Sequence, residues 1–189
     1  FCSKVIDATE VVAAGDIVTA QGILGRKIGV VKAGGSIQTK FIENCFVEAI
    51  GPIRVLTGCL NSVVQTLDRL DSGAKGVISG GKIYARNGIN VAQVGTASGP
   101  KTEIICGIDY TVQQKLLWIR DKNIALAMKL REIDRRAVPG GNPEMTAIRA
   151  KIQASIHQLN EVAKVLVNKL DKNDTAEVIV RGNMYPGTY

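Results

Sequence analysis

The sequence is poor in aromatic residues, in histidine and in paired cysteines, and each shortage argues against a class of protein. Aromatic residues make up 4% of the chain and there is 1 histidine. The cysteines form no C-x-x-C pair, so a zinc site is not expected at Cys2, Cys45, Cys59 or Cys106. No apolar run reaches about 18 residues, and no signal segment opens the chain. We therefore predict no membrane span, and reduced, buried thiols that suit the cytoplasm.

Motifs of catalysis and of cofactor binding are also missing from the sequence. There is no nucleophile elbow, no phosphate-binding loop and no set of metal ligands. His157 stands alone, and we interpret it as a partly exposed helix residue. Asp109 and Asp121 are better explained as charges at the first turns of a helix than as a catalytic pair. We predict a protein that is not an enzyme, with no catalytic residue, no cofactor and no metal.

Glycine-led corners followed by short alternating stretches recur in the first half of the chain. Apolar and polar residues alternate between Ile37 and Ala49, which is typical of short strands with one buried face. The triplet Gly-x-Ile begins at Gly15, Gly35, Gly51 and Gly81. A corner repeated at roughly 16 to 20 residues predicts a mainly β fold, a β-solenoid, with glycine allowing the sharp bend. An antiparallel sandwich with glycine turns is the alternative, and we interpret residues 65–75 as a loop.

Beyond residue 110 the apolar spacing becomes helical. Apolar residues from Val112 to Ile133 follow steps of three and four, with Asn123 at a core position. Asn123 either fixes the register or the partner, or faces water. A turn over 138–143, in which Asn142 is the helix cap, leads to a second stripe from Met145 to Leu170.

Two such helices predict an antiparallel coiled-coil hairpin. The strand pattern returns over 177–182, so that the hairpin is an insertion. We predict solenoid coils over 1–110, the hairpin over 111–172, and a return to the solenoid over 173–189.

Two surfaces of the predicted hairpin are candidates for binding a partner. The first is basic and surrounds the turn, with Arg131, Arg135, Arg136, Arg149 and Lys151. It suits an acidic protein or a phosphate backbone, and a solvated helix surface is the alternative. No aromatic residues interleave with these charges, which weakens the case for single-stranded nucleic acid. The second surface, near the hairpin base, contains Leu117 and Trp118 with Val165 and Val167; it either docks on a solenoid end or forms a subunit interface anchored by Trp118.

Several motifs, in order, resemble the flagellar assembly protein A family. They lie at 27–38 with 41–44, at 99–103 with 107–109, at 112–116, and at 178–182 with 185–187. The resemblance covers nearly the whole chain and implies a right-handed β-helix with an inserted coiled-coil hairpin. It also implies that the N-terminal domain and the end of the C-terminal solenoid lie outside this chain. The abrupt start at Phe1 agrees with an excised piece of a longer protein.

The same resemblance implies a function. A characterised bacterial member promotes flagellation without catalysis, by binding the unphosphorylated glucose-specific carrier protein of the sugar phosphotransferase system. We therefore expect a cytoplasmic scaffold or adaptor that binds a protein partner, with the cell pole as a candidate place and a homo-oligomer left open. A self-assembling filament or polar landmark, like the bactofilin solenoids, is the alternative. Nucleic-acid binding through the basic hairpin is the least favoured function.

Overall fold

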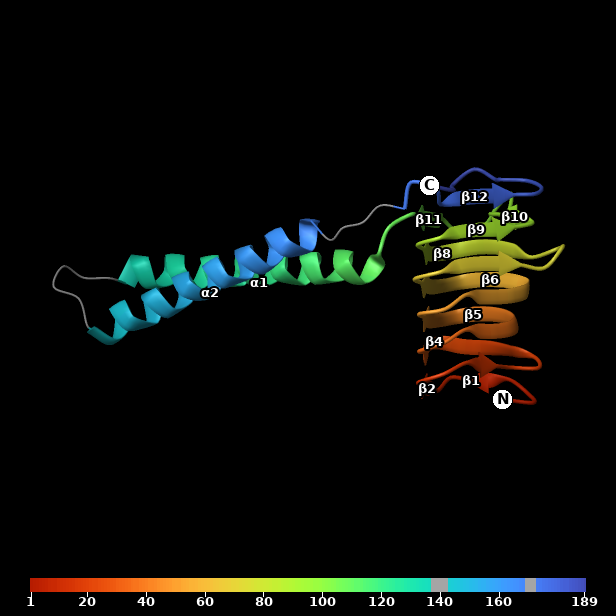
Figure 1. Ribbon diagram of the computed structural model, residues 1–189, viewed down its shortest axis with the longest axis horizontal. Coiled ribbons are helices and arrows are strands. Elements are labelled where there is room, and N and C mark those ends of the chain that lie inside the picture. The colour runs from red at the N-terminus through yellow and green to blue at the C-terminus, as the bar shows by residue number, and fades with distance from the viewer. Residues whose placement is uncertain (137–142, 169–172) are drawn as a thin grey trace. The chain divides into compact units, whose positions relative to one another are not determined.

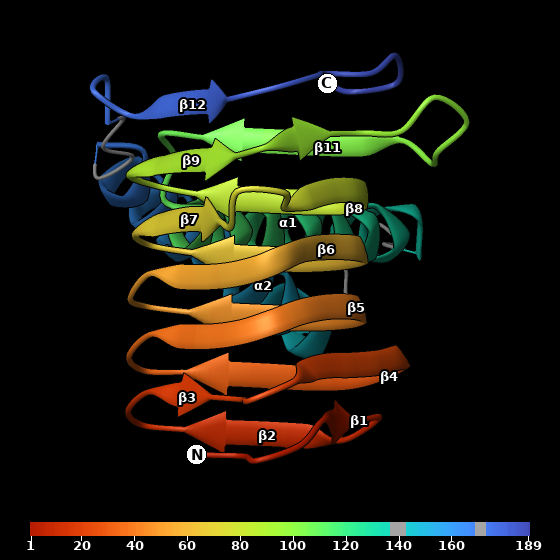
Figure 2. The ribbon, with the colours of Figure 1, turned by 90° about the vertical axis from the view of Figure 1, so that its right-hand side faces the viewer.

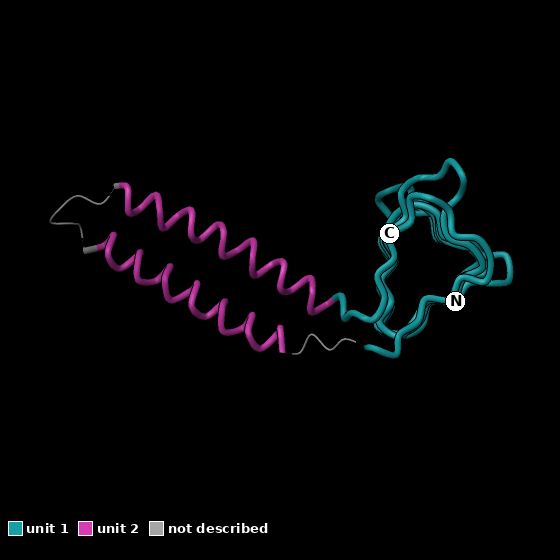
Figure 3. The backbone as a smooth tube through the Cα atoms, turned by 90° about the horizontal axis from the view of Figure 1, so that it is seen from above, with its two compact units in different colours: residues 1–110, 172–189 teal, residues 111–171 magenta. Residues whose placement is uncertain are grey.

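The computed structural model describes residues 1–136, 143–168 and 173–189. The chain divides into two compact units, one of residues 1–110 with 172–189 and one of residues 111–171 (Figure 3). The centre of the predicted turn, with Asn142, and the predicted stripe residue Leu170 lie outside the described residues.

The first unit is a β-solenoid of about 5 turns, and its strands stack one above another (Figures 1 and 2). Every ladder between described strands is parallel. The predicted solenoid is therefore confirmed, and the antiparallel sandwich is wrong. The strands are β1 (Ile6–Asp7), β2 (Glu10–Ala13), β3 (Ile17–Val18), β4 (Gly22–Ala33), β5 (Ile37–Ala49), β6 (Ile53–Thr66), β7 (Arg69–Ser72), β8 (Val77–Ala85), β9 (Gly88–Val91), β10 (Gln93–Val94), β11 (Thr102–Cys106) and β12 (Glu177–Val180).

Equivalent residues of successive turns pair in register in three ladders. Figure 3 views the superimposed turns from above. One ladder joins Ile17, Ile37, Ile53, Leu70, Ile89 and Val178. The second joins Val11, Val31, Val47, Val64, Ile83 and Ile104. The third joins Ile6, Ile23, Ile42, Cys59, Ile78 and Val94. Most of these side chains are fully buried. Burying one aliphatic side chain of this kind contributes about 1.5–3 kcal/mol, so each turn is stabilised by the turns above and below it.

The first three predicted Gly-x-Ile corners are confirmed, but the fourth is wrong. Ile17, Ile37 and Ile53 belong to one ladder, whereas Ile83 pairs with Val64 on another side. The corner that follows Gly51 in this series lies within the segment 65–75, because Ile53 pairs with Leu70. The prediction of a loop over 65–75 is therefore also wrong. This segment contains β7, whose Leu70 is fully buried although its neighbours are charged. A single apolar residue is enough to continue the ladder, because a short strand points only alternate side chains inward.

At the Gly35 corner glycine is required by crowding rather than by an unusual backbone angle, whereas a Cβ at Gly15 would meet nothing within 4 Å. Gly35 lacks a positive φ, yet a Cβ built on it would collide with Asp16 Oδ1. The Gly35 amide donates to the Gly15 carbonyl at 3.1 Å, so the corners of neighbouring turns stack directly on each other. Asp16 also accepts hydrogen bonds from the amide and the hydroxyl of Ser36, and these hold the pKa of Asp16 below its usual range.

A second corner in each turn is bent by a residue with positive φ, which the sequence pattern did not reveal. The residues at this corner are Ala8, Arg26 with Lys27, Asn44, Asn61, Gly80 and Gly95. The long strands β4, β5, β6 and β8 run through it and so cover two sides of the solenoid. Asparagine tolerates the left-handed conformation better than other non-glycine residues, which explains Asn44 and Asn61.

The two helices are α1 (Tyr110–Arg136) and α2 (Pro143–Asn168), and they lie side by side (Figures 1 and 3). The predicted apolar seam of α1 is at least half-buried, and Ile119 is its most buried member. Ile148, a member of the second apolar stripe on α2, is 45% exposed.

Asn123 lies between the two helices. Its amide donates to Asn160 Oδ1 at 2.8 Å, and its own Oδ1 is buried. The interpretation that Asn123 faces water is therefore wrong. A buried amide that pairs across two helices favours one register over its neighbours.

In the part of the chain that the structure describes, no helix combines the length and the apolar character needed to cross a membrane.

Candidate partner-binding surface

The predicted basic residues occupy the last turns of α1 and the first turns of α2. Arg131, Arg135, Arg149 and Lys151 are exposed, while the side chain of Arg136 lies outside the described residues. Arg149 Nε forms an ion pair with Asp134 Oδ1 at 3.0 Å, which links the two helices. Such exposed pairs contribute about 0–1 kcal/mol, so Arg149 remains able to exchange its partner.

Trp118 lies in the other half of α1 and is 56% exposed. The ammonium of Lys122 lies 5.7 Å from the centre of its ring, within the range of a cation–π contact. At 1.5 Å per residue Trp118 is about 20 Å from Arg131 along the helix, so the two candidate surfaces are separate. Leu117, Val165 and Val167 are also exposed. Their docking on a solenoid end and their use in a subunit interface both stay predictions.

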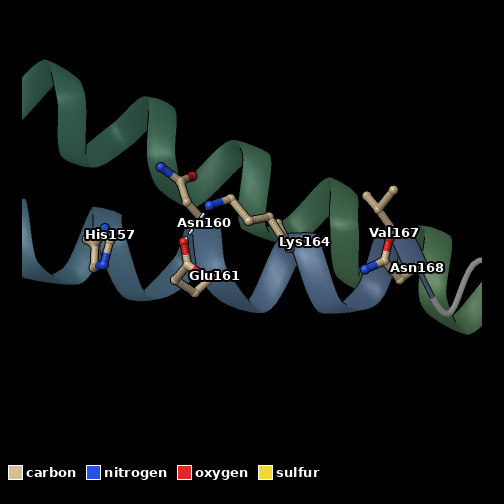
Figure 4. Close-up of a pocket in the computed structure, with 7 residues that line it drawn as sticks. His157, Asn160, Glu161, Lys164, Val167 and Asn168 are labelled. Carbon is tan, nitrogen blue, oxygen red and sulfur yellow. Dashed lines mark hydrogen bonds and ion pairs between the residues drawn. The ribbon is translucent and has the colours of Figure 1, made fainter.

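An open hollow of about 680 Å³ runs along α2 (Figure 4). Polar side chains line most of it, and His157 is exposed at one end, as predicted for a helix histidine. Lys164 donates to Glu161 Oε1 at 2.7 Å, and this bond lowers the pKa of Glu161. Asn160 points toward α1, where it meets Asn123. The hollow therefore offers a partner both hydrogen-bond donors and hydrogen-bond acceptors.

A second hollow of about 450 Å³ lies between the helices. Its lining is mostly apolar and includes Ile119 and Ile124 of α1. The hollow arises at Ala127 and Ala163, because an alanine side chain fills less volume than the leucine or isoleucine found elsewhere in the seam. The sequence signal for this hollow was the alanine at a core position of the second stripe.

Tyr110 is a buried residue near the insertion that the sequence analysis missed. It belongs to the solenoid unit and is 2% exposed. Its hydroxyl donates to Glu48 Oε1 at 3.2 Å, and Lys32 pairs with Glu48 Oε2 at 3.3 Å. Burial and the negative charge of Glu48 raise the pKa of Tyr110. The available signal was an aromatic residue, in a chain with few, between the strand and helix patterns.

The chain leaves the solenoid and rejoins it at one corner. The Asn173 amide donates to the Gly107 carbonyl at 2.9 Å, so the two ends of the insertion are adjacent. A ladder of side chains supports this corner, with Asn173 Nδ2 donating to Asn87 Oδ1 and Asn87 Nδ2 donating to Asp68 Oδ1, both at 3.0 Å. At this corner, hydrogen bonds between side chains of successive turns replace the close backbone contacts between the glycines of the earlier turns.

The cysteines are free thiols at separate places in the solenoid. Cys59 stacks on Ile42, and Cys45 Sγ donates to the Gly29 carbonyl at 3.2 Å. Burial raises the pKa of Cys45 to about 11 and that of Cys59 to about 12. Both behave as the buried, reduced residues that we predicted. Among the described residues, no group of three or more His, Cys, Asp or Glu side chains could hold a metal ion.

We expect Cys45 and Cys59 to resist thiol reagents in the native protein. At pH 8 a thiol with a pKa of about 11 is ionised in about one molecule in a thousand, and both sulfurs are buried. Cys2 and Cys106 are only half-buried and should react first. A colorimetric thiol assay before and after denaturation measures this, with all four thiols reacting only in the unfolded chain. Rapid native labelling of Cys59, mapped by mass spectrometry, would contradict its place in the core.

The family model described as "Flagellar Assembly Protein A beta solenoid domain" matches residues 3–189. The matched range includes the solenoid strands and both helices. No match was found among the curated proteins or among the solved structures.

Proposed function

Because the chain belongs to the Flagellar Assembly Protein A β-solenoid domain family, we propose that it is a non-catalytic scaffold that presents its helices to a partner protein. Membership of this family suggests a role related to flagellar assembly. The observation that carries the proposal is the exposed surface of the helices, where Trp118 and the cations Arg131, Arg135 and Lys151 are all exposed. Tryptophan and arginine are the residues that most often dominate the energy of protein interfaces.

The helices form an antiparallel coiled coil in this proposal. Asn123 contacts Asn160, and Asp134 contacts Arg149. The second contact lies eleven residues nearer the C-terminus on α1 and eleven residues nearer the N-terminus on α2. Two antiparallel helices produce this relation. The hairpin spans residues 111–172 and is inserted between the solenoid segments 1–110 and 173–189. The solenoid coils are right-handed in the proposal, as crossover connections between parallel strands almost always are.

The partner that this surface fits is an acidic protein. The chain has a net charge of +7, and arginine binds carboxylates through two parallel hydrogen bonds. The unphosphorylated glucose-specific carrier of the sugar phosphotransferase system is the candidate that the family resemblance implies, and the cytoplasm, including the cell pole, is the place where the two would meet. We place contacts at Arg131, Arg135, Arg136, Arg149 and Lys151, with Trp118 as a separate apolar anchor.

Reversing three charges at the basic surface should weaken capture of the partner. In a variant with Arg135→Glu, Arg136→Glu and Arg149→Glu we expect the Kd to rise about tenfold or more, since each lost pair costs about 0.5–1 kcal/mol and repulsion is added. The remaining binding should depend less on salt, because fewer charge pairs are left to screen. Titration calorimetry with the purified unphosphorylated carrier at two salt concentrations measures both effects.

The matched control reverses three exposed cations of the solenoid, Lys40→Glu, Arg54→Glu and Lys75→Glu. It changes the net charge equally and should leave the Kd nearly unchanged. If the wild-type chain does not bind the carrier, that partner is wrong, and affinity capture from lysate with the same two variants then tests the surface itself. Equal capture by both variants would end the proposal for the basic surface.

Two other functions predicted from the sequence remain predictions. A filament would appear as higher-order polymers in sedimentation, whereas a scaffold would give a discrete species. Nucleic-acid binding would show a steep loss of affinity with salt.

A further inference from the structure

Helix α1 carries a second apolar stripe beside its seam with α2. Leu117, Ile124 and Met128 are 44%, 52% and 66% exposed. Successive residues of an α-helix are about 100° apart, so these three share one side of α1. The same spacing centres the seam residues Leu116, Ile119 and Asn123 about 130° away around the helix. Ile124 lies at the edge between the two sets, where it also lines the hollow between the helices. Long apolar side chains exposed in a row mark a surface that another molecule covers.

Charged residues complete this stripe in a regular order. From Leu117 to Arg135 the steps are alternately four and three residues, as in a coiled-coil seam. The set, which we name the outer stripe of α1, is Leu117, Asp121, Ile124, Met128, Arg131 and Arg135. All six side chains are exposed. Asp121 and Arg131 lie at equal distances on either side of the midpoint between Ile124 and Met128.

The geometry points to a second copy of this chain as the occupant, paired antiparallel through the outer stripe. A two-fold axis between Ile124 and Met128 sets Ile124 against Met128 of the second copy. The same axis sets Asp121 against Arg131 of the second copy, and two-fold symmetry makes each contact twice. The apolar centre is then flanked on both sides by pairs of opposite charge, and Leu117 packs against the aliphatic stem of Arg135 of the second copy.

The charges also select the direction of pairing. In a parallel pair each residue would face its own equivalent, so that Asp121 would meet Asp121 and Arg131 would meet Arg131. Such like-charge contacts are unfavourable. Within one chain Asp121 pairs with Arg120 at 3.0 Å, but both side chains are largely exposed, and such a pair contributes little. Asp121 can therefore exchange Arg120 for Arg131 of the second copy.

The test is a charge exchange between the two positions in the whole chain. In the Asp121→Arg variant both positions, 121 and 131, are arginine. In the Arg131→Asp variant both are aspartate. Each variant alone should dimerise at least about tenfold more weakly than the wild-type chain, because both charged contacts become repulsive. An equimolar mixture of the two variants, and a single chain with both changes, should recover the dimer. Sedimentation equilibrium measures the dissociation constants, and circular dichroism reports whether each variant is folded.

Lys129→Glu is the matched control, because Lys129 is exposed on another side of α1. It should leave the dimer unchanged. A wild-type chain that stays monomeric up to about 1 mM would overturn the inference. A dimer that neither single variant weakens would also overturn it, by placing the contact elsewhere. Weakening without recovery in the mixture would refute the antiparallel pairing. Arg131 also belongs to the proposed basic surface, so the dimer is measured on the purified chain alone. No partner protein is present in that measurement, and the inference therefore stands or fails independently of the proposed partner.

Discussion

Replacing Gly58 by alanine is expected to destabilise the solenoid by about 3 kcal/mol. Gly58 has a φ of 127°, in a region that residues with a side chain rarely adopt. A Cβ at this position would also collide with the backbone carbonyl oxygen of Val77 in the next turn. Gly58 lies within β6 and pairs with Phe41 on one side and Val77 on the other, so neither neighbour can move away without breaking a ladder.

Thermal unfolding followed by circular dichroism measures the effect. A loss of about 3 kcal/mol in a chain of this size lowers the Tm by about 6–12 °C. Gly15→Ala is the matched control, because Gly15 lacks a positive φ and a Cβ there would meet nothing within 4 Å. Its expected effect is a change of less than about 1 kcal/mol, in the stabilising direction. Equal Tm values for the two variants would contradict the strained backbone at Gly58.

Removing the helices is expected to abolish partner capture while leaving the solenoid folded. In this variant a short Gly-Ser linker replaces residues 111–171, which form a separate compact unit. Tyr110 is retained because it is buried against Glu48 in the solenoid unit. The hydrogen bond from Asn173 to Gly107 holds the two ends of the insertion together, so a short linker can close the gap. Shortening a connecting loop changes the closure entropy by only about 0.6 kcal/mol for each halving of its length.

Two measurements separate the outcomes of this deletion. Circular dichroism should retain the strand signal with a Tm within a few degrees of the full chain, and affinity capture should lose the partner completely. The Lys40, Arg54 and Lys75 reversal variant serves as the control that keeps the helices. Capture that survives the deletion would move the binding site to the solenoid. A deletion variant that fails to fold would show that the helices are not a separable insertion.

Local pattern was enough to predict the solenoid. Alternation over Ile37–Ala49 indicated most of the side chains that point inward, and these residues are buried as expected. Phe41 is the exception, because it is only partly buried and Ile42 takes the buried position. Three Gly-x-Ile corners indicated the repeat. At one of them, Gly35, the backbones of successive turns approach so closely that glycine is favoured. The apolar spacing from Val112 likewise predicted a helix with one buried seam. These features depend on neighbours within one strand or one helical turn.

Other features could not be predicted, because they depend on residues that meet only after the turns have stacked. Leu70 looked like part of a charged loop, and it is a ladder residue because Ile53 and Ile89 lie on either side of it. The bond between Tyr110 and Glu48 joins residues 62 positions apart. At the candidate surface, the sequence suggested the cations, but the ion pair between Arg149 and Asp134 required two helices side by side.

The amino-acid order alone therefore determined the kind of repeat, the change from strand to helix near residue 110, and the polar Asn123 within an apolar seam. Only the tertiary structure decided which ladder each residue joins, where the backbone turns left-handed at Asn44 and Asn61, and which side chains stay exposed on α1. The physical reason is that inward or outward direction follows from a period of two or of 3.6 residues along the chain. Pairing partners and exposure follow instead from turns that are about 16 to 20 residues apart in sequence and only one strand spacing apart in space.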